Sequence, residues 1–204
     1  GDMELLYIDT NPQSLGEPDE VNETIAHELS HLLMFSQDPR EAAFVDEGVA
    51  DYAGYLATEQ FPWSHIHAFE AQPDVSLTQF NDGLASYGAS FLYVLYLNEQ
   101  FGTDLIGDVM RNPKAGIEGV NATLKTRGHS QTFDSIYADH KVANFISDRT
   151  FADGRFGYER LRLNPATTAT YRTYPTQGSG GVSAYGTDYI EFKQATADLQ
   201  LTFT

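Results

Sequence analysis

The sequence predicts an α+β chain that is mainly helical, with a small N-terminal sheet and a β-rich C-terminal segment. Two observations indicate this class. Up to about residue 163, apolar residues recur at intervals of three and four. The sequence then becomes rich in Thr, Tyr and Gly and alternates as strands do. We therefore expect a helical domain over residues 1–163 and, over residues 164–204, strands that belong to a larger β domain.

The elements follow in order along the chain. The apolar run Leu5–Asp9 predicts a short strand, and residues Gln60–Asp82 are expected to be irregular because prolines and Asn81-Asp82-Gly83 interrupt them. Helices are expected wherever the apolar spacing is helical: Val21–Leu33, Glu41–Leu56, Ser86–Phe101, Thr103–Met110, Ile117–Lys125 and Phe133–Asp148. Strands are expected at Tyr185–Lys193 and Leu199–Thr204.

Composition and charge exclude several functions. Among 204 residues there are 29 acidic and 12 basic side chains, a net charge of −17, which repels nucleic-acid backbones and anionic lipid surfaces. The longest apolar stretch, Phe91–Leu97, is too short to span a bilayer. We therefore expect no nucleic-acid partner and no membrane insertion. The acidic excess fits either a high-salt habitat or an ordinary acidic extracellular domain.

The chain has no cysteine, so any metal must be held by His and carboxylates. His27-Glu28-Leu-Ser-His31 is an H-E-x-x-H pattern inside a predicted helix. Residues four apart share a helix face, so His27 and His31 can bind one metal ion while Glu28 reaches its water. The alternative is that both histidines are polar residues beside a core stripe.

A second motif, the acidic segment Asp46-Glu47-Gly48, begins fifteen residues after His31 on the next predicted helix. Catalytic zinc sites use three protein ligands, and two His with one carboxylate is a common set. We predict one zinc ion bound by His27, His31 and Glu47, with Asp46 the next candidate for the third ligand. Asp51, one turn after Glu47, can accept the other ring N–H of a ligating histidine, and His27 is the expected one. The alternative is a solvated acidic helix face.

These motifs resemble the gluzincin metallopeptidases, the group of thermolysin and aminopeptidase N. The chain is most similar to the hyicolysin-like family of secreted bacterial metallopeptidases. The resemblance is carried by Leu6–Pro12, Ala26–His31, Val45–Gly48 and Ser86–Leu92. It implies a zincin-like catalytic domain, with Glu47 as third ligand and an extracellular or cell-surface location. The spacing from His31 to Glu47 is shorter than in thermolysin. The chain therefore departs from the family pattern in the loop around Asp38–Ala42.

Tyr87 opens the strongest predicted helix, and the resemblance implies that its hydroxyl stabilises the oxyanion of the transition state. His129 and His140 are alternatives for that role, or surface residues. His65 and His67 can bind a second metal if their segment is extended, although we favour a loop lining the cleft.

The predicted function is that of a zinc endopeptidase or closely related peptidase, acting on protein or peptide substrates with Glu28 as general base. The alternative is a catalytically silent zincin scaffold used for surface binding or adhesion. The intact Glu28 favours the enzyme.

Overall fold

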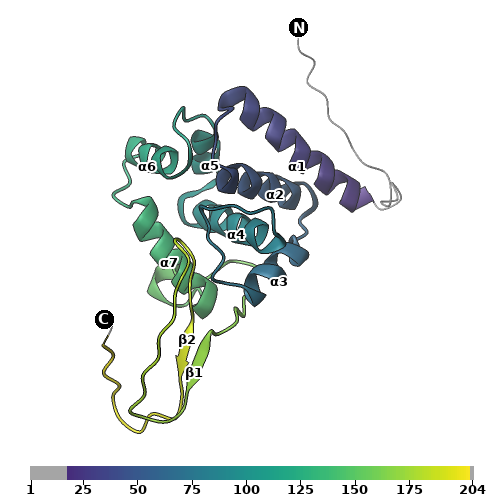
Figure 1. Ribbon diagram of the computed structural model, residues 1–204. Helices are drawn as coiled ribbons and strands as arrows, with labels where there is room; N and C mark the ends of the chain where they lie inside the picture. Colours follow the sequence, from purple (N-terminus) through teal and green to yellow (C-terminus); the bar gives the residue numbers. More distant parts are fainter. Residues whose placement is uncertain (1–17, 203–204) are drawn as a thin grey trace.

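The computed structural model describes residues 18–202, which form a mostly helical domain of seven helices with a small two-stranded parallel sheet near the C-terminus (Figure 1). The helices are α1 (Pro18–Gln37), α2 (Ala43–Thr58), α3 (Trp63–Ala71), α4 (Leu84–Phe101), α5 (Thr103–Met110), α6 (Gly116–Thr126) and α7 (Phe133–Ile146). A 3-10 turn (Ala152–Gly154) precedes strands β1 (Ala169–Tyr171) and β2 (Ile190–Phe192).

Helix α4 forms the centre of the molecule. Every residue from Gly88 to Leu97 is buried, as expected of a helix that is apolar on all sides. Helix α2 packs between α1 and α4, and α3 packs on α4, so the first four helices form one continuous stack (Figure 1). Among the described helices, none is both long enough and apolar enough to cross a membrane.

Two glycines allow these helices to approach closely. A methyl group on Gly48 of α2 would lie 2.7 Å from the carbonyl oxygen of Ser90 in α4. A methyl group on Gly88 of α4 would overlap the carbonyl oxygen of His65 in α3. Both glycines are adjacent in sequence to candidate site residues, Glu47 and Tyr87. The backbone contacts therefore fix the spacing of the helices where the site lies.

The predicted helices are found with ends shifted by a few residues, but the expectation of irregular structure over Gln60–Asp82 is wrong. Nine of these residues form α3, with Pro62 at its N-cap position and Pro73 just beyond its end. The prolines therefore bracket the helix. Ile66 and Phe69, three residues apart, are fully buried and hold it against the core. His65 and His67 thus lie on a helix, not on an extended strand or a loop.

The apolar stripe of α1 is only partly covered. Ser30 and Met34 are buried, whereas Leu29 and Leu33 remain about half exposed. The helix therefore turns toward α2 along a line that includes His27 and His31. For α1, the partner helix decides which face is covered, and the apolar pattern does not.

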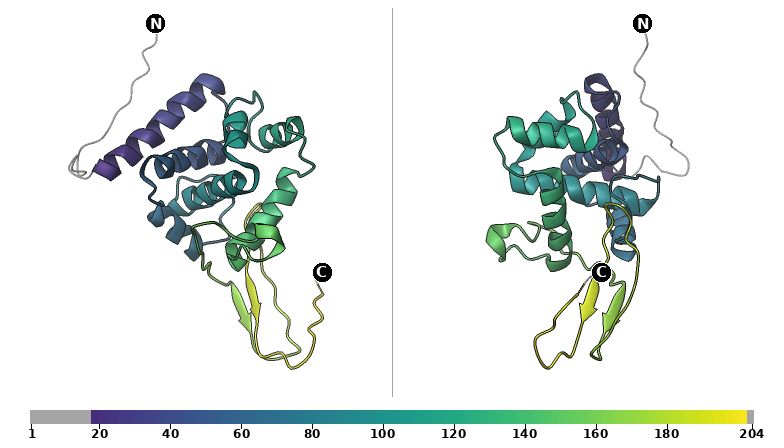
Figure 2. Two further views of the ribbon diagram at one scale, coloured as in Figure 1. Left: turned by 180° about the vertical axis from the view of Figure 1, so that it is seen from behind. Right: turned by 60° about the vertical axis from the view of Figure 1, so that its left-hand side comes forward.

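The predicted strand Tyr185–Lys193 is reduced to the three residues of β2, and its partner β1 was not predicted. β1 and β2 pair in parallel over three residues each, with Ala169 opposite Ile190 and Tyr171 opposite Phe192. They form a narrow arm that projects from the helices (Figure 2). Residues 199–202 form no strand, because a pair of strands without a covering layer gains little from lengthening. The predicted strand Leu5–Asp9, the Leu6–Pro12 motif and residues 203–204 lie outside the described residues.

Hydrogen bonds to backbone carbonyls attach this segment to the helical part. The amide of Leu77 donates to the carbonyl of Tyr185 at 2.9 Å, and the hydroxyl of Tyr189 donates to the carbonyl of Lys141 in α7 at 2.8 Å.

Candidate metal centre

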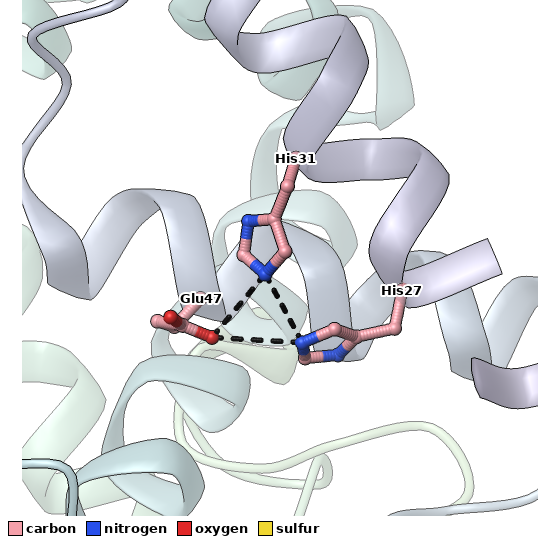
Figure 3. Close-up of side chains that lie close together, drawn as sticks. All are labelled: His27, His31 and Glu47. Carbon is pink, nitrogen blue, oxygen red and sulfur yellow. Dashed lines mark hydrogen bonds and ion pairs between the residues drawn. The ribbon is translucent and has the colours of Figure 1, made fainter. Parts of the chain in front are cut away.

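Three side chains from two helices point toward one another (Figure 3). His27 and His31 lie one turn apart on α1, and their Nε2 atoms are 3.1 Å apart. Glu47 comes from the first turns of α2, and its Oε2 lies 3.6 Å from each Nε2. The three side chains are between 20% and 26% exposed, so the group lies near the surface without being open to it.

The spacing of these atoms matches a tetrahedral zinc site. Ligand bonds of about 2.0–2.1 Å at the tetrahedral angle place neighbouring ligand atoms about 3.4 Å apart. The observed separations of 3.1 and 3.6 Å lie on either side of that value. Within the described residues, this is the one group of His, Asp and Glu whose ligand atoms converge tightly enough to hold a metal ion.

The far nitrogens of both imidazoles are bonded to carboxylates of α2. His27 Nδ1 lies 3.1 Å from Asp51 Oδ1, and His31 Nδ1 lies 2.9 Å from Asp46 Oδ1. Because a carboxylate accepts, each Nδ1 carries the proton and donates it. In a neutral imidazole the Nε2 then bears a lone pair. Two lone pairs thus converge with Glu47 Oε2, which is buried and has no hydrogen-bond partner among the described residues. With both imidazoles neutral, these three acceptors can hold one cation between them; in the metal-free protein a proton on His27, whose pKa is raised, takes that place.

The local charges favour a cation at this position. Burial lowers the pKa of His27, but bonds to Asp51 and Glu47 outweigh it and raise the pKa to about 10. The bond to Asp46 raises the pKa of His31 against the opposing effect of burial. Burial raises the pKa of Asp51, but bonds from His27 and His65 lower it below its usual value, so Asp51 stays ionised. A metal ion at this position would therefore meet the negative charge of these carboxylates and displace the proton of His27.

The sequence reasoning missed the contact of Asp46, which it considered only as a reserve ligand. Helices α1 and α2 form an antiparallel hairpin, so the end of α1 lies beside the start of α2. His31 therefore contacts Asp46, and His27, one turn earlier, contacts Asp51. The order of the residues, together with the short Asp38-Pro39 turn and the expected pair of His27 with Asp51, could have indicated the pair of His31 with Asp46 as well.

The sequence also did not indicate that His65 contacts Asp51 and Tyr87. From α3 its Nδ1 donates to Asp51 Oδ2 at 2.6 Å. Its ring stacks on the ring of Tyr87, at the start of α4, with centroids 4.9 Å apart and planes 27° apart. Phe80 meets the same tyrosine edge-on at 4.9 Å. His67, two residues along the helix, is exposed and stacks on Trp63, so the two histidines do not converge on a second metal.

The remaining predicted residues occupy different positions. Glu28 is partly buried on α1 beside His27. Burial raises the pKa of Tyr87 most, and the negative charges of Glu47, Asp82, Asp51 and Glu28 raise it further. The hydroxyl of Tyr87 is therefore close enough to the site for its carboxylates to affect it. His140 is fully buried between Tyr93 and Tyr96, not a surface residue, and His129 packs against Phe101.

Comparison of the chain with protein-family models and with curated protein sequences finds no match.

Proposed function

We propose that the protein is a zinc-dependent peptidase with a gluzincin-like site. The observation that carries this proposal is the convergence of His27 Nε2, His31 Nε2 and Glu47 Oε2, three acceptors with both Nδ1 protons committed to carboxylates. These residues fit zinc in donor type, number and spacing. The zincin-like fold and the resemblance to hyicolysin-like peptidases belong to the same proposal.

Bound zinc would polarise the carbonyl of the scissile peptide bond and lower the pKa of an attacking water. Asp51 and Asp46 keep the two imidazoles in the tautomer that presents Nε2. Glu28 adjoins His27 on the helix but is not needed as a ligand, so its carboxylate is free to take the proton from the water. It then delivers that proton to the leaving amine.

Tyr87 is the group we assign to the developing oxyanion. Its raised pKa keeps the phenol protonated, and a protonated phenol donates a hydrogen bond. The ring is held by His65 on one side and Phe80 on another, so its orientation is set before substrate binds. A preorganised donor stabilises charge without having to reorganise during the reaction.

The test separates metal binding from chemistry at Glu28. Glu28→Gln is expected to keep zinc, measured by metal analysis after dialysis, and to lose about 10²- to 10⁴-fold in the rate of peptide hydrolysis. Glu20→Gln is the matched control, because Glu20 is an exposed acid near the start of the same helix. It should leave both measurements unchanged.

Two outcomes contradict the proposal. Full activity in Glu28→Gln would remove the general base. A wild-type protein that holds one zinc yet cleaves no peptide from a diverse library would favour a silent binding scaffold.

A further inference from the structure

A single carboxylate joins three helices at the edge of the metal group, by which we mean His27, His31 and Glu47 together. Asp51 on α2 accepts from His27 on α1 through Oδ1 and from His65 on α3 through Oδ2. Its side chain is 5% exposed. Both oxygens are therefore engaged, and the bond from His65 is the shorter one, 2.6 Å against 3.1 Å. The orientation of the carboxylate that His27 meets depends on His65.

The same imidazole supports Tyr87. The two rings stack with centroids 4.9 Å apart, while the edge contact with Phe80 limits the tyrosine from another direction. The backbone of His65 is fixed as well, because its carbonyl lies against Gly88, the residue after Tyr87. A change in the ring of His65 therefore reaches Tyr87 directly.

We infer that His65 is a positioning residue with two separable contacts: its Nδ1–H orients Asp51 and through it the ligand His27, and its ring orients Tyr87. The inference rests on the proposed function for the role of Tyr87, whereas the effect on the metal requires only that the site binds zinc. His65 thereby links metal affinity to turnover through one side chain.

Two substitutions separate the contacts. His65→Phe keeps an aromatic ring beside Tyr87 and removes the donor to Asp51. His65→Asn keeps an N–H at the δ position and removes the ring. His67→Phe is the control, because His67 lies on the same helix, is exposed and contacts Trp63 instead. Far-UV circular dichroism and thermal unfolding establish that each variant is folded.

Metal affinity is measured by competition with a chromophoric chelator, and ligand geometry by the visible spectrum of the cobalt(II)-substituted protein. For His65→Phe we expect a loss of about ten- to a hundred-fold in zinc affinity, the usual effect of removing such an outer hydrogen bond, and a shifted cobalt spectrum. His65→Asn should retain the affinity and spectrum of the wild type. Its kcat should fall while KM stays nearly unchanged, because an oxyanion contact is made only in the transition state.

The inference is overturned if His65→Phe binds zinc as the wild type does, or if His65→Asn keeps full turnover. Equal loss of affinity in both variants would assign His65 a merely structural role and would also overturn it. The metal measurements use no substrate. A wild type that binds zinc without cleaving peptides would defeat the proposed function and the Tyr87 part alone, whereas an active wild type with unaffected variants would defeat only this inference.

Discussion

At the scale of single residues, each imidazole of the metal group has one carboxylate partner that fixes its tautomer. When both imidazoles are neutral, the Nδ1 bonds to Asp51 and Asp46 leave the Nε2 atoms of His27 and His31 as the free acceptors. Glu47 offers the third, an oxygen without a partner in the part of the chain that the structure describes. Asp46 and Glu47 are neighbours of the same chemistry, and their different contacts are the basis on which we propose Glu47 as a metal ligand and Asp46 as an outer hydrogen-bond acceptor.

This assignment predicts different losses from two conservative substitutions. Glu47→Gln should reduce zinc retention most, because an amide oxygen is a weak ligand for zinc. Asp46→Asn should cost only about ten- to a hundred-fold in affinity, since it removes an outer hydrogen bond. Chelator competition followed by metal analysis measures both. The reverse order of loss would make Asp46 the third ligand.

At the scale of elements, the site depends on how closely three pairs of helices approach. Gly48 sets the approach of α2 to α4, and Gly88 sets the approach of α3 to α4. In a third pair, a methyl group on Gly54 of α2 would lie 2.9 Å from the side chain of Glu23 on α1. Each glycine lies within two turns of a residue of the candidate site. Small residues at these crossings bring the side chains into bonding range.

Gly88→Ala is therefore expected to destabilise the protein although alanine favours helices. Overpacking typically costs about 1–3 kcal/mol. The gain in helix propensity offsets about 1 kcal/mol of it. The added methyl group pushes on the backbone of His65, so peptidase activity should fall as well. Thermal unfolding and kcat/KM measure the two effects.

Gly107→Ala in α5 is the matched control. An added methyl group there meets only the flexible end of Arg111, at 3.3 Å, so the substitution should stabilise slightly or do nothing. Equal stability of both variants would mean that α3 and α4 can separate without cost.

At the scale of the whole molecule, the metal group ties α1 to α2, and α2 is held by the core helix α4. Zinc that binds only the folded state adds stability by mass action, about 2.7 kcal/mol at a free concentration one hundred times Kd. For a chain of this size we expect the melting temperature to rise by roughly 5–10 °C over that of chelator-treated protein. No difference in melting temperature would show that zinc does not bind the folded state at this site.

The size of this stabilisation should depend on pH. In the metal-free protein the pKa of His27, raised to about 10, exceeds the ordinary value of 6.5 that it has when unfolded. The folded state therefore binds a proton more tightly, and this stabilisation is complete below about pH 6.5 and lost as the pH rises toward 10. Zinc competes with the same proton. The gap in melting temperature between zinc-loaded and chelated protein should widen from pH 6.5 to 9. A constant gap would contradict the competition.

The sequence by itself determined most of the helices and the pattern His27-Glu28-x-x-His31 followed by Asp46-Glu47 and Asp51, because helical spacing and ligand spacing are local. It did not find α3, whose nine residues are too few for a clear period and lie between two prolines. It also overestimated the length of the strand at Tyr185–Lys193 and missed β1, since the position and length of a strand depend on its partners.

Only the tertiary structure decided which atoms meet. In the folded protein His31 is hydrogen-bonded to Asp46, and His65 is hydrogen-bonded to Asp51 and stacks on Tyr87. These contacts connect residues on different helices, and their distances depend on crossings that Gly48 and Gly88 permit. The face of α1 that is buried was decided in the same way: Leu29 and Leu33 stay exposed because α2 packs along the side that carries the histidines. Spacing along one helix fixes what can share a face, whereas the approach of a second helix fixes what that face contacts.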